Sequence, residues 1–284
     1  MIYQGKIIRS SAKLYQVLLD DGRLVEAFAM GKLRLDKTPL VGDHVTVEDL
    51  GDKFGIQEIH ERFNRLYRPN IVNVDQVFIV MSCVEPDFHS FLCDKMVFKA
   101  NLANIHPILV FTKLDLIPID HYVYRFIKDY QQSGYDVVLS QNEGLVDSFK
   151  SYLKGKISVL SGNSGVGKST LLNRLDSDLQ LKTQKISKAL GRGKHTTTNT
   201  TLFEIGEGYV ADTPGFSTLS FENESKLELS KAVLDFKQYH NCKFNDCLHV
   251  SEPQCGIKEA VKSGLISEIR YNNYLKVLEE IKED

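Results

Sequence analysis

The chain has 284 residues, of which 42% are hydrophobic and 25% are charged, and its formal net charge is −2. This composition is typical of a folded protein with two or three compact units, and it excludes an intrinsically disordered chain. The near balance of charge excludes a protein that is basic over its whole surface, so any contact with a nucleic acid must be local.

Neither a membrane span nor a secretory leader is expected. No apolar run approaches the roughly 18 to 20 residues that a membrane helix needs. The start of the chain, Met1 to Lys6, lacks the basic and then apolar pattern of a signal peptide. The five cysteines are too few and too unevenly placed for a disulfide framework. We therefore expect a cytoplasmic protein without membrane contact.

Residues 1–66 are predicted to form a small β-barrel. Turn signals such as Asp21-Gly22 separate short runs in which apolar and polar residues alternate, and no helical period occurs. The expected strands are Tyr3–Ile8, Leu14–Leu19, Leu24–Phe28, His44–Val47 and Gly55–Ile59. A barrel of this size is most often an OB-fold, which commonly binds RNA, although it can also be a packing module. The charged stretch Glu61–Asn70 is interpreted as a linker.

A different pattern begins near Val74 and predicts a parallel sheet covered by helices. Buried strands at Asp75–Met81, Ile108–Phe111 and Asp136–Leu139 alternate with helical segments at Leu92–Asn104 and His121–Ser133. Ligands of such sheets bind at the carboxyl ends of the strands, where Thr112–Asp115 and Ser140 are expected.

Thr112-Lys113-Leu114-Asp115 resembles the guanine-specificity motif of GTPases, usually Asn-Lys-x-Asp. The carboxylate of Asp115 can accept hydrogen bonds from both N1–H and the 2-amino group of guanine, and adenine offers neither donor on that edge. Lys113 is expected to lay its stem along the base. Thr112 replaces the usual Asn, which is expected to weaken a hydrogen bond that braces the loop.

The segment from Lys156 to Leu175 is predicted to form a strand, a phosphate-binding loop and a helix, in that order. Glycines let backbone N–H groups turn toward a polyphosphate, Lys168 can reach its β and γ phosphates, and the Ser169 hydroxyl can bind Mg²⁺. A chance match in a surface loop is the alternative, and the flanking strand and helix signals disfavour it. The expected loop contacts are Gly162, Asn163, Ser164, Gly165, Val166, Gly167, Lys168, Ser169 and Thr170.

Two switch segments follow the phosphate loop. Gly191–Thr198 resembles switch I, whose threonine reaches Mg²⁺ and the γ-phosphate; Thr197 is taken for this role, with Thr196 as the alternative. Tyr209–Phe216 resembles the strand and Asp-x-x-Gly of switch II, in which Asp212 holds Mg²⁺ through water and the Gly215 N–H bonds the γ-phosphate. Because the guanine motif precedes the phosphate loop, the domain is predicted to be a circular permutant of the Ras-like fold.

The permuted order, the N-terminal barrel and the segment Gly191-Arg-Gly-Lys-His-Thr-Thr197 together resemble the RsgA family of small-ribosomal-subunit-dependent GTPases. The resemblance implies a monomer that binds GTP and GDP, the 30S subunit and its 16S rRNA, and that assists late maturation of that subunit. The expected domains are an OB-fold at 1–66, a permuted α/β GTPase domain at 67–221 and a mainly helical zinc-binding domain at 222–284.

The family also implies one structural zinc ion per chain. Cys242, Cys247, His249 and Cys255 match a closed Cys₃His site, for which buried reduced cysteines or redox chemistry are the alternatives. His240 is expected to be a surface histidine. The remainder, Ile257–Ile281, is expected to form helices.

The residue that orients the attacking water is not obvious from the switch II motif. Phe216 occupies the position of the glutamine that Ras-like enzymes use. The resemblance points instead to His195, whose imidazole can orient water near neutral pH. The alternative is that His195 is an ordinary exposed histidine in a loop.

The run of cations from Lys182 to Lys194 favours a contact with RNA. The alternative is that these side chains form an ordinary solvent-exposed face. A metabolic P-loop kinase and a non-hydrolysing, nucleotide-gated RNA-binding module are the rival functions.

Overall fold

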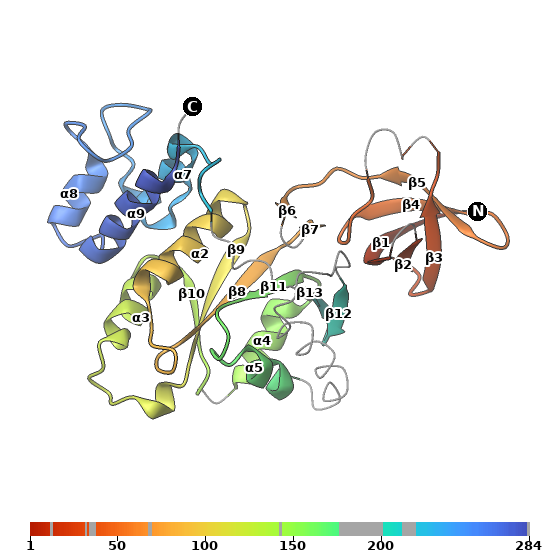
Figure 1. The fold of residues 1–284 in the computed structure, drawn as a ribbon, viewed down its shortest axis with the longest axis horizontal. Coiled ribbons are helices and arrows are strands. Elements are labelled where there is room, and N and C mark those ends of the chain that lie inside the picture. Colours follow the sequence, from red (N-terminus) through yellow and green to blue (C-terminus); the bar gives the residue numbers. More distant parts are fainter. Residues whose placement is uncertain are drawn as a thin grey trace. The chain divides into compact units, whose positions relative to one another are not determined.

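The structure is a computed structural model that describes residues 1–11, 14–31, 33, 38–67, 70–141, 144–175, 201–211 and 220–282 (Figure 1). The chain forms two compact units, and each is described by itself. The first comprises Met1–Gln76, Val146–Leu160 and Ser169–Phe216. The second comprises Val77–Leu145, Ser161–Lys168 and Ser217–Asp284.

The first unit begins with the predicted barrel. Its strands pair in the order β1-β2-β3-β5-β4, and β4 closes the barrel by pairing with β1. Alternate side chains such as Ile7, Val17 and Val45 are fully buried, because successive residues of a strand face opposite sides. The OB-like barrel is therefore confirmed. The strands are β1 Ile2–Ser11, β2 Leu14–Leu19, β3 Leu24–Ala29, β4 His44–Asp49 and β5 Phe54–Ile59.

The stretch interpreted as a linker has structure of its own. β6 (Arg65–Tyr67) and β7 (Asn70–Val72) pair antiparallel, and Leu66 and Ile71 are buried. Just before β6, Arg62 forms an ion pair with the buried Asp43, with an N–O distance of 2.7 Å. The charged residues that indicated a linker are thus partly tied to the barrel.

The first unit also contains a small mixed sheet with strand order β11-β13-β12. β11 and β13 are parallel, with Val159 opposite Ala211, and β12 and β13 form an antiparallel hairpin. The elements of this part are α4 Leu145–Leu153, β11 Ile157–Ser161, α5 Lys168–Leu175, β12 Leu202–Ile205 and β13 Gly208–Ala211.

The second unit holds the predicted β-α-β region, with strand order β10-β9-β8. β10 and β9 are parallel, and every residue of β8 is buried, as expected for strands covered on both faces. α2 packs on β9 and α3 packs on β10. The elements are β8 Gln76–Ser82, α2 Ser90–Leu102, β9 His106–Thr112, α3 Val123–Gln132 and β10 Asp136–Leu139.

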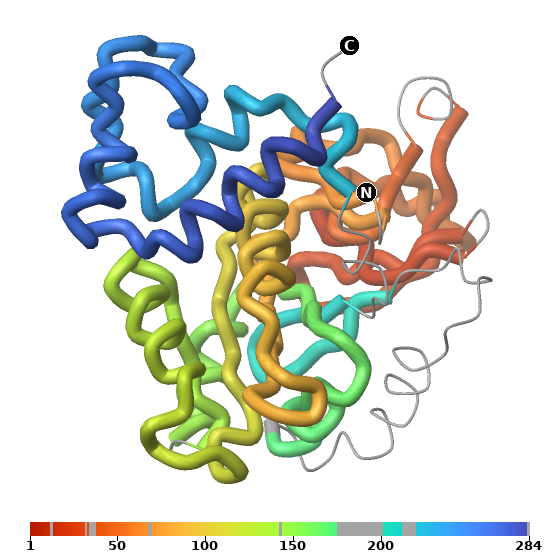
Figure 2. Tube along the Cα trace, turned by 60° about the vertical axis from the view of Figure 1, so that its left-hand side comes forward, coloured from red at the N-terminus to blue at the C-terminus, as the bar shows by residue number. Residues whose placement is uncertain are grey.

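The C-terminal part of the second unit is helical. α2 and α9 lie side by side in both views (Figures 1 and 2). The loop between the 3₁₀ helix η3 and α8 carries the cysteine cluster. The elements are α7 Lys226–Ala232, η3 Leu234–Tyr239, α8 Gly256–Lys262 and α9 Glu268–Glu280.

Candidate nucleotide and metal sites

The predicted phosphate loop lies between β11 and α5. Gly162 has φ 141°, and a Cβ built there would lie 2.3 Å from the carbonyl oxygen of Val80, so only glycine fits. The Lys168 ammonium donates to the carbonyls of Gly162 and Asn163, each at 2.6 Å. Burial lowers the pKa of Lys168. The loop is therefore folded around its own lysine, whose ammonium is bonded to two loop carbonyls in this structure.

Thr112, the last residue of β9, joins the guanine motif to the phosphate loop. Its hydroxyl lies 2.6 Å from the carbonyl oxygen of Val166 and 3.3 Å from that of Met81, and it donates chiefly to Val166. The sequence argument expected a weakened brace at this position. The structure shows that the threonine hydroxyl itself makes a bond to the loop, and the expected weakening relative to Asn stays a prediction.

The remaining residues of the guanine motif follow directly. Lys113 adopts a left-handed conformation with φ 59°, and its ammonium donates to the carbonyl of Glu85. Asp115 lies in the short 3₁₀ helix η1 (Leu114–Leu116) with its side chain exposed. Ser140 follows β10, and its N–H donates to the carbonyl of Phe111 at 2.9 Å, so the two strand ends are adjacent. An exposed carboxylate at the end of β9 can accept hydrogen bonds from a base.

The predicted magnesium ligands are only partly described. Ser169 and Thr170 lie in the first turn of α5, as expected for a loop that opens a helix. Thr197, Thr196, His195, Asp212, Gly215 and Phe216 lie outside the described residues, as does the basic run from Lys182 to Lys194. The hairpin nevertheless fixes where the switch segments attach: Leu202 pairs with Ala211, so the start of β12 and the end of β13 lie at the same end of the hairpin.

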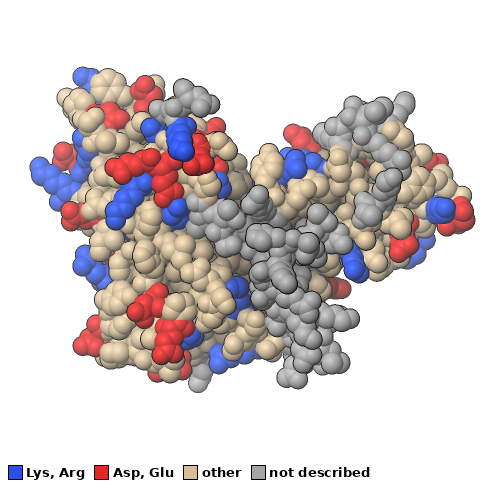
Figure 3. Space-filling view, in the orientation of Figure 1, with Lys and Arg blue, Asp and Glu red and all other residues tan. Residues whose placement is uncertain are grey.

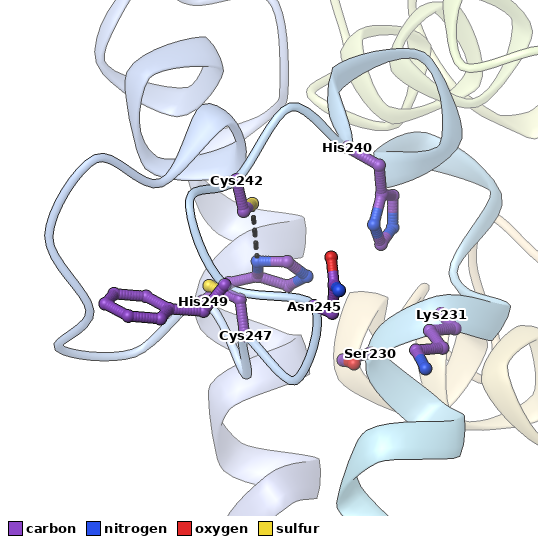
Figure 4. A pocket seen from close by; sticks show the side chains of 8 residues that line it. Ser230, Lys231, His240, Cys242, Asn245, Cys247 and His249 are labelled. Atoms are coloured by element: carbon purple, nitrogen blue, oxygen red, sulfur yellow. Dashed lines mark hydrogen bonds between the residues drawn. The ribbon is translucent and has the colours of Figure 1, made fainter.

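The cysteine cluster is assembled as predicted. The ligand atoms of Cys242, Cys247, His249 and Cys255 all lie within 4.8 Å of one another. Nδ1 of His249 is 3.5 Å from Sγ of Cys242 and 3.4 Å from Sγ of Cys255, and Figure 4 shows the imidazole turned toward Cys242. Three thiols and one imidazole nitrogen at this spacing fit a closed tetrahedral metal site.

Surrounding groups hold the loop of the cluster in shape. Glu252 accepts hydrogen bonds from the N–H groups of Leu248 and Val250, while the hydroxyl of Tyr274 donates to the carbonyl of Leu248 at 2.8 Å. Burial lowers the pKa of His249 to about 4, which keeps the ring in the neutral form that binds metals. His240 is exposed, as expected, but its ring stands edge-on to that of His249 at a centroid distance of 5.2 Å.

Sequence reasoning missed a buried charge network that joins α9 to α2 and η3. Arg270 is 2% exposed and forms ion pairs with Asp94 at 2.9 Å and with Asp235 at 2.7 Å. The guanidinium also lies 4.0 Å from the ring centroid of Tyr130. Burial raises the pKa of Asp94, whereas at Asp235 burial is outweighed by Arg270 and the pKa falls. These residues are far apart in the sequence, and no local motif marks them.

The face shown in Figure 3 does not carry a broad field of one sign over its described residues. On the face shown in Figure 3, basic and acidic side chains are interspersed over the described residues. Among the described helices, none has the length and apolar character to cross a membrane.

Comparison with known proteins identifies the family. Residues 59–222 match the model of the RsgA GTPase and residues 4–56 match the RsgA N-terminal domain. The chain is 46% identical to the "Small ribosomal subunit biogenesis GTPase RsgA" of Geobacillus sp. (strain WCH70), covering 99% of this chain and 98% of the relative. A protein of the same name from Bacillus anthracis is 42% identical over 99% of this chain and 98% of its own length.

Solved structures agree with this assignment. "The crystal structure of YloQ, a circularly permuted GTPase" matches with TM-score 0.84 and 33% identity, covering 99% of this chain and 95% of that one. YjeQ from Thermotoga maritima matches with the same score and identity, covering 99% and 98%. The guanine motif ahead of the phosphate loop, the N-terminal barrel and the Cys₃His cluster are thus the parts of one known architecture: the chain belongs to the RsgA GTPase family and is a circularly permuted GTP hydrolase.

Proposed function

We propose that this GTPase binds the 30S ribosomal subunit, assists its late maturation, and hydrolyses GTP to GDP and phosphate faster when the subunit is bound. The observation that carries the proposal is similarity along the whole chain, 46% over 99% of its length, to a protein named for small ribosomal subunit biogenesis. We further infer that the protein contacts 16S rRNA as a cytoplasmic monomer. The domain division at residues 66 and 221 belongs to the same proposal.

The nucleotide is assigned to the phosphate loop and the strand ends beside it. In this proposal the Asp115 carboxylate accepts hydrogen bonds from guanine. Lys113, Thr112 and Ser140 complete the base-binding part of the nucleotide site. The bond from Thr112 to the Val166 carbonyl supports it, because it links base recognition to the loop. Lys168 leaves its two loop carbonyls to bind the β and γ phosphates. The other phosphate-loop contacts are Gly162, Asn163, Ser164, Gly165, Val166, Gly167, Ser169 and Thr170, with Gly215 at the γ-phosphate.

Mg²⁺ is expected to accompany GTP at Ser169, Thr197 and Asp212. When bound, it neutralises charge that develops on the phosphates during transfer. The described residues fit this role, since Ser169 lies in the first turn of α5, and the switch I segment ends and the switch II segment begins at the same end of the β12–β13 hairpin. Zn²⁺ is the metal proposed for Cys242, Cys247, His249 and Cys255, where a closed site stabilises the fold and leaves no position for catalysis.

His195 is proposed to orient the attacking water. Lys168 and Thr197 are the other two proposed catalytic groups. This assignment rests on the sequence, because Phe216 cannot bond water. Replacing His195 with Ala should leave GTP affinity nearly unchanged and lower stimulated turnover by roughly 10² to 10⁴. An unchanged stimulated rate would remove His195 from the mechanism.

Nucleotide-dependent binding to the subunit tests the proposal as a whole. Cosedimentation with purified 30S particles should retain more protein with a non-hydrolysable GTP analogue than with GDP, by roughly 5- to 150-fold in affinity. Binding should also weaken steeply as salt rises, because contacts to RNA phosphates release counterions. Equal retention in both nucleotide states would contradict the proposed switch.

A further inference from the structure

The outer edge of β12 lies beside a strand of the barrel and is bridged to it at the residue just before β12. Within the first unit, β12 pairs with β13 on one side and lies beside β1 on the other. There Thr201, the residue just before β12, forms an antiparallel bridge with Arg9 of β1. An edge strand offers unpaired N–H and C=O groups, so this bridge fixes the start of β12 to the barrel.

A second contact joins the same strand to the hairpin. The Lys6 ammonium of β1 lies 5.3 Å from the centroid of the Tyr209 ring on β13. Lys6 is half-buried, and burial lowers its pKa, while Asp75 and Asp20 act in the opposite direction. A desolvated cation over an aromatic face is a stabilising contact that solvent does not readily replace. Lys6 and Arg9 therefore hold the hairpin from one strand.

The backbone of β1 is irregular where it reaches β12. Its register against β2 shifts between Ile7 and Arg9, the mark of a β-bulge. Bulges bend a strand and turn side chains and backbone groups in new directions. This bulge lies beside the bridge to Thr201. The bend therefore allows β1 to pair within the barrel and also to contact the start of β12.

The bridge between Arg9 and Thr201 bears on hydrolysis because the two proposed magnesium-binding segments adjoin it in the sequence. Thr201 closes the segment that contains His195 and Thr197, and Ala211, which pairs with Leu202, leads directly into Asp212. Thr201 follows Thr197 closely in the sequence, so a contact at Thr201 acts at the point where the switch I segment joins β12. The segment with Thr197 therefore ends, and the segment with Asp212 begins, at the hairpin end that β1 contacts.

We propose that β1 is a positioning element for GTP hydrolysis, acting through Lys6 and through the bridge between Arg9 and Thr201. The barrel then contributes to the reaction without touching the nucleotide. The inference rests on the proposed roles of Thr197 and Asp212, and it goes beyond them by assigning residues of the N-terminal barrel to the intrinsic reaction.

Intrinsic turnover without ribosomal subunits tests this. Lys6→Met keeps the aliphatic stem and removes the charge, Lys6→Arg restores a cation, and Lys53→Met makes the matched change at an exposed barrel lysine. Lys6→Met should lower kcat by roughly 5-fold or more, the lower end of typical coupling between sites, with KM for GTP unchanged. Lys6→Arg should regain most of the rate, and Lys53→Met should match the wild type.

A disulfide across the bridge gives an independent readout. Residues opposite one another in an antiparallel pair have the Cα spacing that a disulfide needs. Oxidised Arg9→Cys/Thr201→Cys protein should hydrolyse GTP at least as fast as its reduced form, and in the Lys6→Met background oxidation should restore kcat. The single Arg9→Cys variant, oxidised in parallel, controls for damage to other thiols.

The inference is overturned if Lys6→Met keeps the wild-type kcat while the wild type hydrolyses GTP, a result that leaves the GTPase assignment intact. Equal losses in Lys6→Met and Lys53→Met, or a raised KM with unchanged kcat, would also overturn it. If Lys6→Met does not fold, the disulfide pair decides alone: slower turnover in its oxidised form than in its reduced form rejects a positioning role for the bridge.

Discussion

Thr112 links base recognition to phosphate binding through a single hydroxyl. It is 6% exposed, and its hydrogen bond of 2.6 Å reaches the carbonyl of Val166, which is itself buried in the phosphate loop. A buried carbonyl that loses its donor keeps the cost of its desolvation. The side chain at this position should therefore affect both the stability of the loop and the affinity for nucleotide.

Replacing Thr112 with Val removes the hydroxyl and keeps the shape of the side chain. We expect a loss of about 1 to 3 kcal/mol in the free energy of unfolding, because the Val166 carbonyl is left unpaired. GTP affinity should fall as well. Thr112→Ser, which retains the hydroxyl, is the matched control and should remain close to the wild type in urea unfolding. Equal stability of the Val and Ser variants would show that the bond is not needed.

Asp115 is the residue that should set the choice of base. Its carboxylate accepts from two donors of guanine, and an amide in its place can donate to the 2-oxygen of xanthine. Asp115→Asn should therefore bind xanthine nucleotides in preference to GTP, while its phosphate contacts stay intact. Competition binding with GTP, XTP and ATP measures this. A wild-type protein that bound GTP and ATP equally would contradict the assignment.

Individual functional residues could be predicted from the sequence where they belong to one contiguous motif. The loop from Gly162 to Lys168 and the motif at Thr112 each follow an apolar strand, so their positions could be predicted. The bond between Thr112 and Val166 could not be, because it joins segments that meet only after folding. The hydrogen bond from the Lys113 ammonium to the Glu85 carbonyl could not be predicted either, for the same reason.

The helix α9 is held against its neighbours by Arg270. The guanidinium donates to Asp235 through Nε and through a terminal nitrogen, each at 2.7 Å, and Asn273 of the same helix donates to Asp94 at 2.7 Å. The two carboxylates come from η3 and α2. Such a network specifies how helices pack only while every member is present.

Arg270→Met should destabilise the protein strongly. Removal of one member of a buried ion pair typically costs about 3 to 5 kcal/mol, because the remaining charge is left uncompensated. Here two carboxylates would remain without their cation. Urea unfolding measures the loss. Arg23→Met, which breaks an exposed pair with Asp21, is the control and should cause a much smaller change. Equal midpoints for the two variants would contradict the structural role of Arg270.

The metal cluster should determine whether the loop between η3 and α8 is folded. Purified protein should carry one zinc per chain, and Cys242→Ser should lose most of it, since the apparent binding free energy of a structural site, about 10 to 16 kcal/mol, depends on a full set of ligands. His240→Ala should retain zinc, because His240 lies beside the cluster and outside the ligand set. Metal analysis and limited proteolysis with and without a chelator check both points. Protein prepared without chelators that held no zinc would contradict the site.

Elements were predictable where periodicity was strong. The barrel strands, β8 to β10, and helices α2 and α3 lie within a few residues of the predicted spans. The pairing of β6 with β7 was not anticipated, because strands of three residues are too short to show a period and lie in a charged stretch that resembles a linker. The network around Arg270 was missed for a related reason: a charged helix face normally indicates solvent, and only tertiary packing places Arg270 inside.

On the scale of the whole molecule, the chain combines an OB-like barrel, a circularly permuted GTPase domain and a helical region that carries the Cys₃His cluster, and we propose that the bound nucleotide controls its affinity for a partner. The face shown in Figure 3 is mixed in charge over its described residues, so RNA affinity is expected to depend on local contacts. A partner that binds several parts at once can favour one nucleotide state only if its contacts differ between states.

The most direct test is GTP turnover measured with and without purified 30S subunits, with Lys168→Ala as the background for contaminating hydrolysis. The account predicts slow intrinsic turnover by the wild type, a large increase on adding 30S, and no increase for Lys168→Ala. Turnover that stayed negligible with saturating 30S would instead indicate a nucleotide-gated binding protein. Rapid turnover that did not respond to 30S would contradict the subunit-dependent GTPase proposed here.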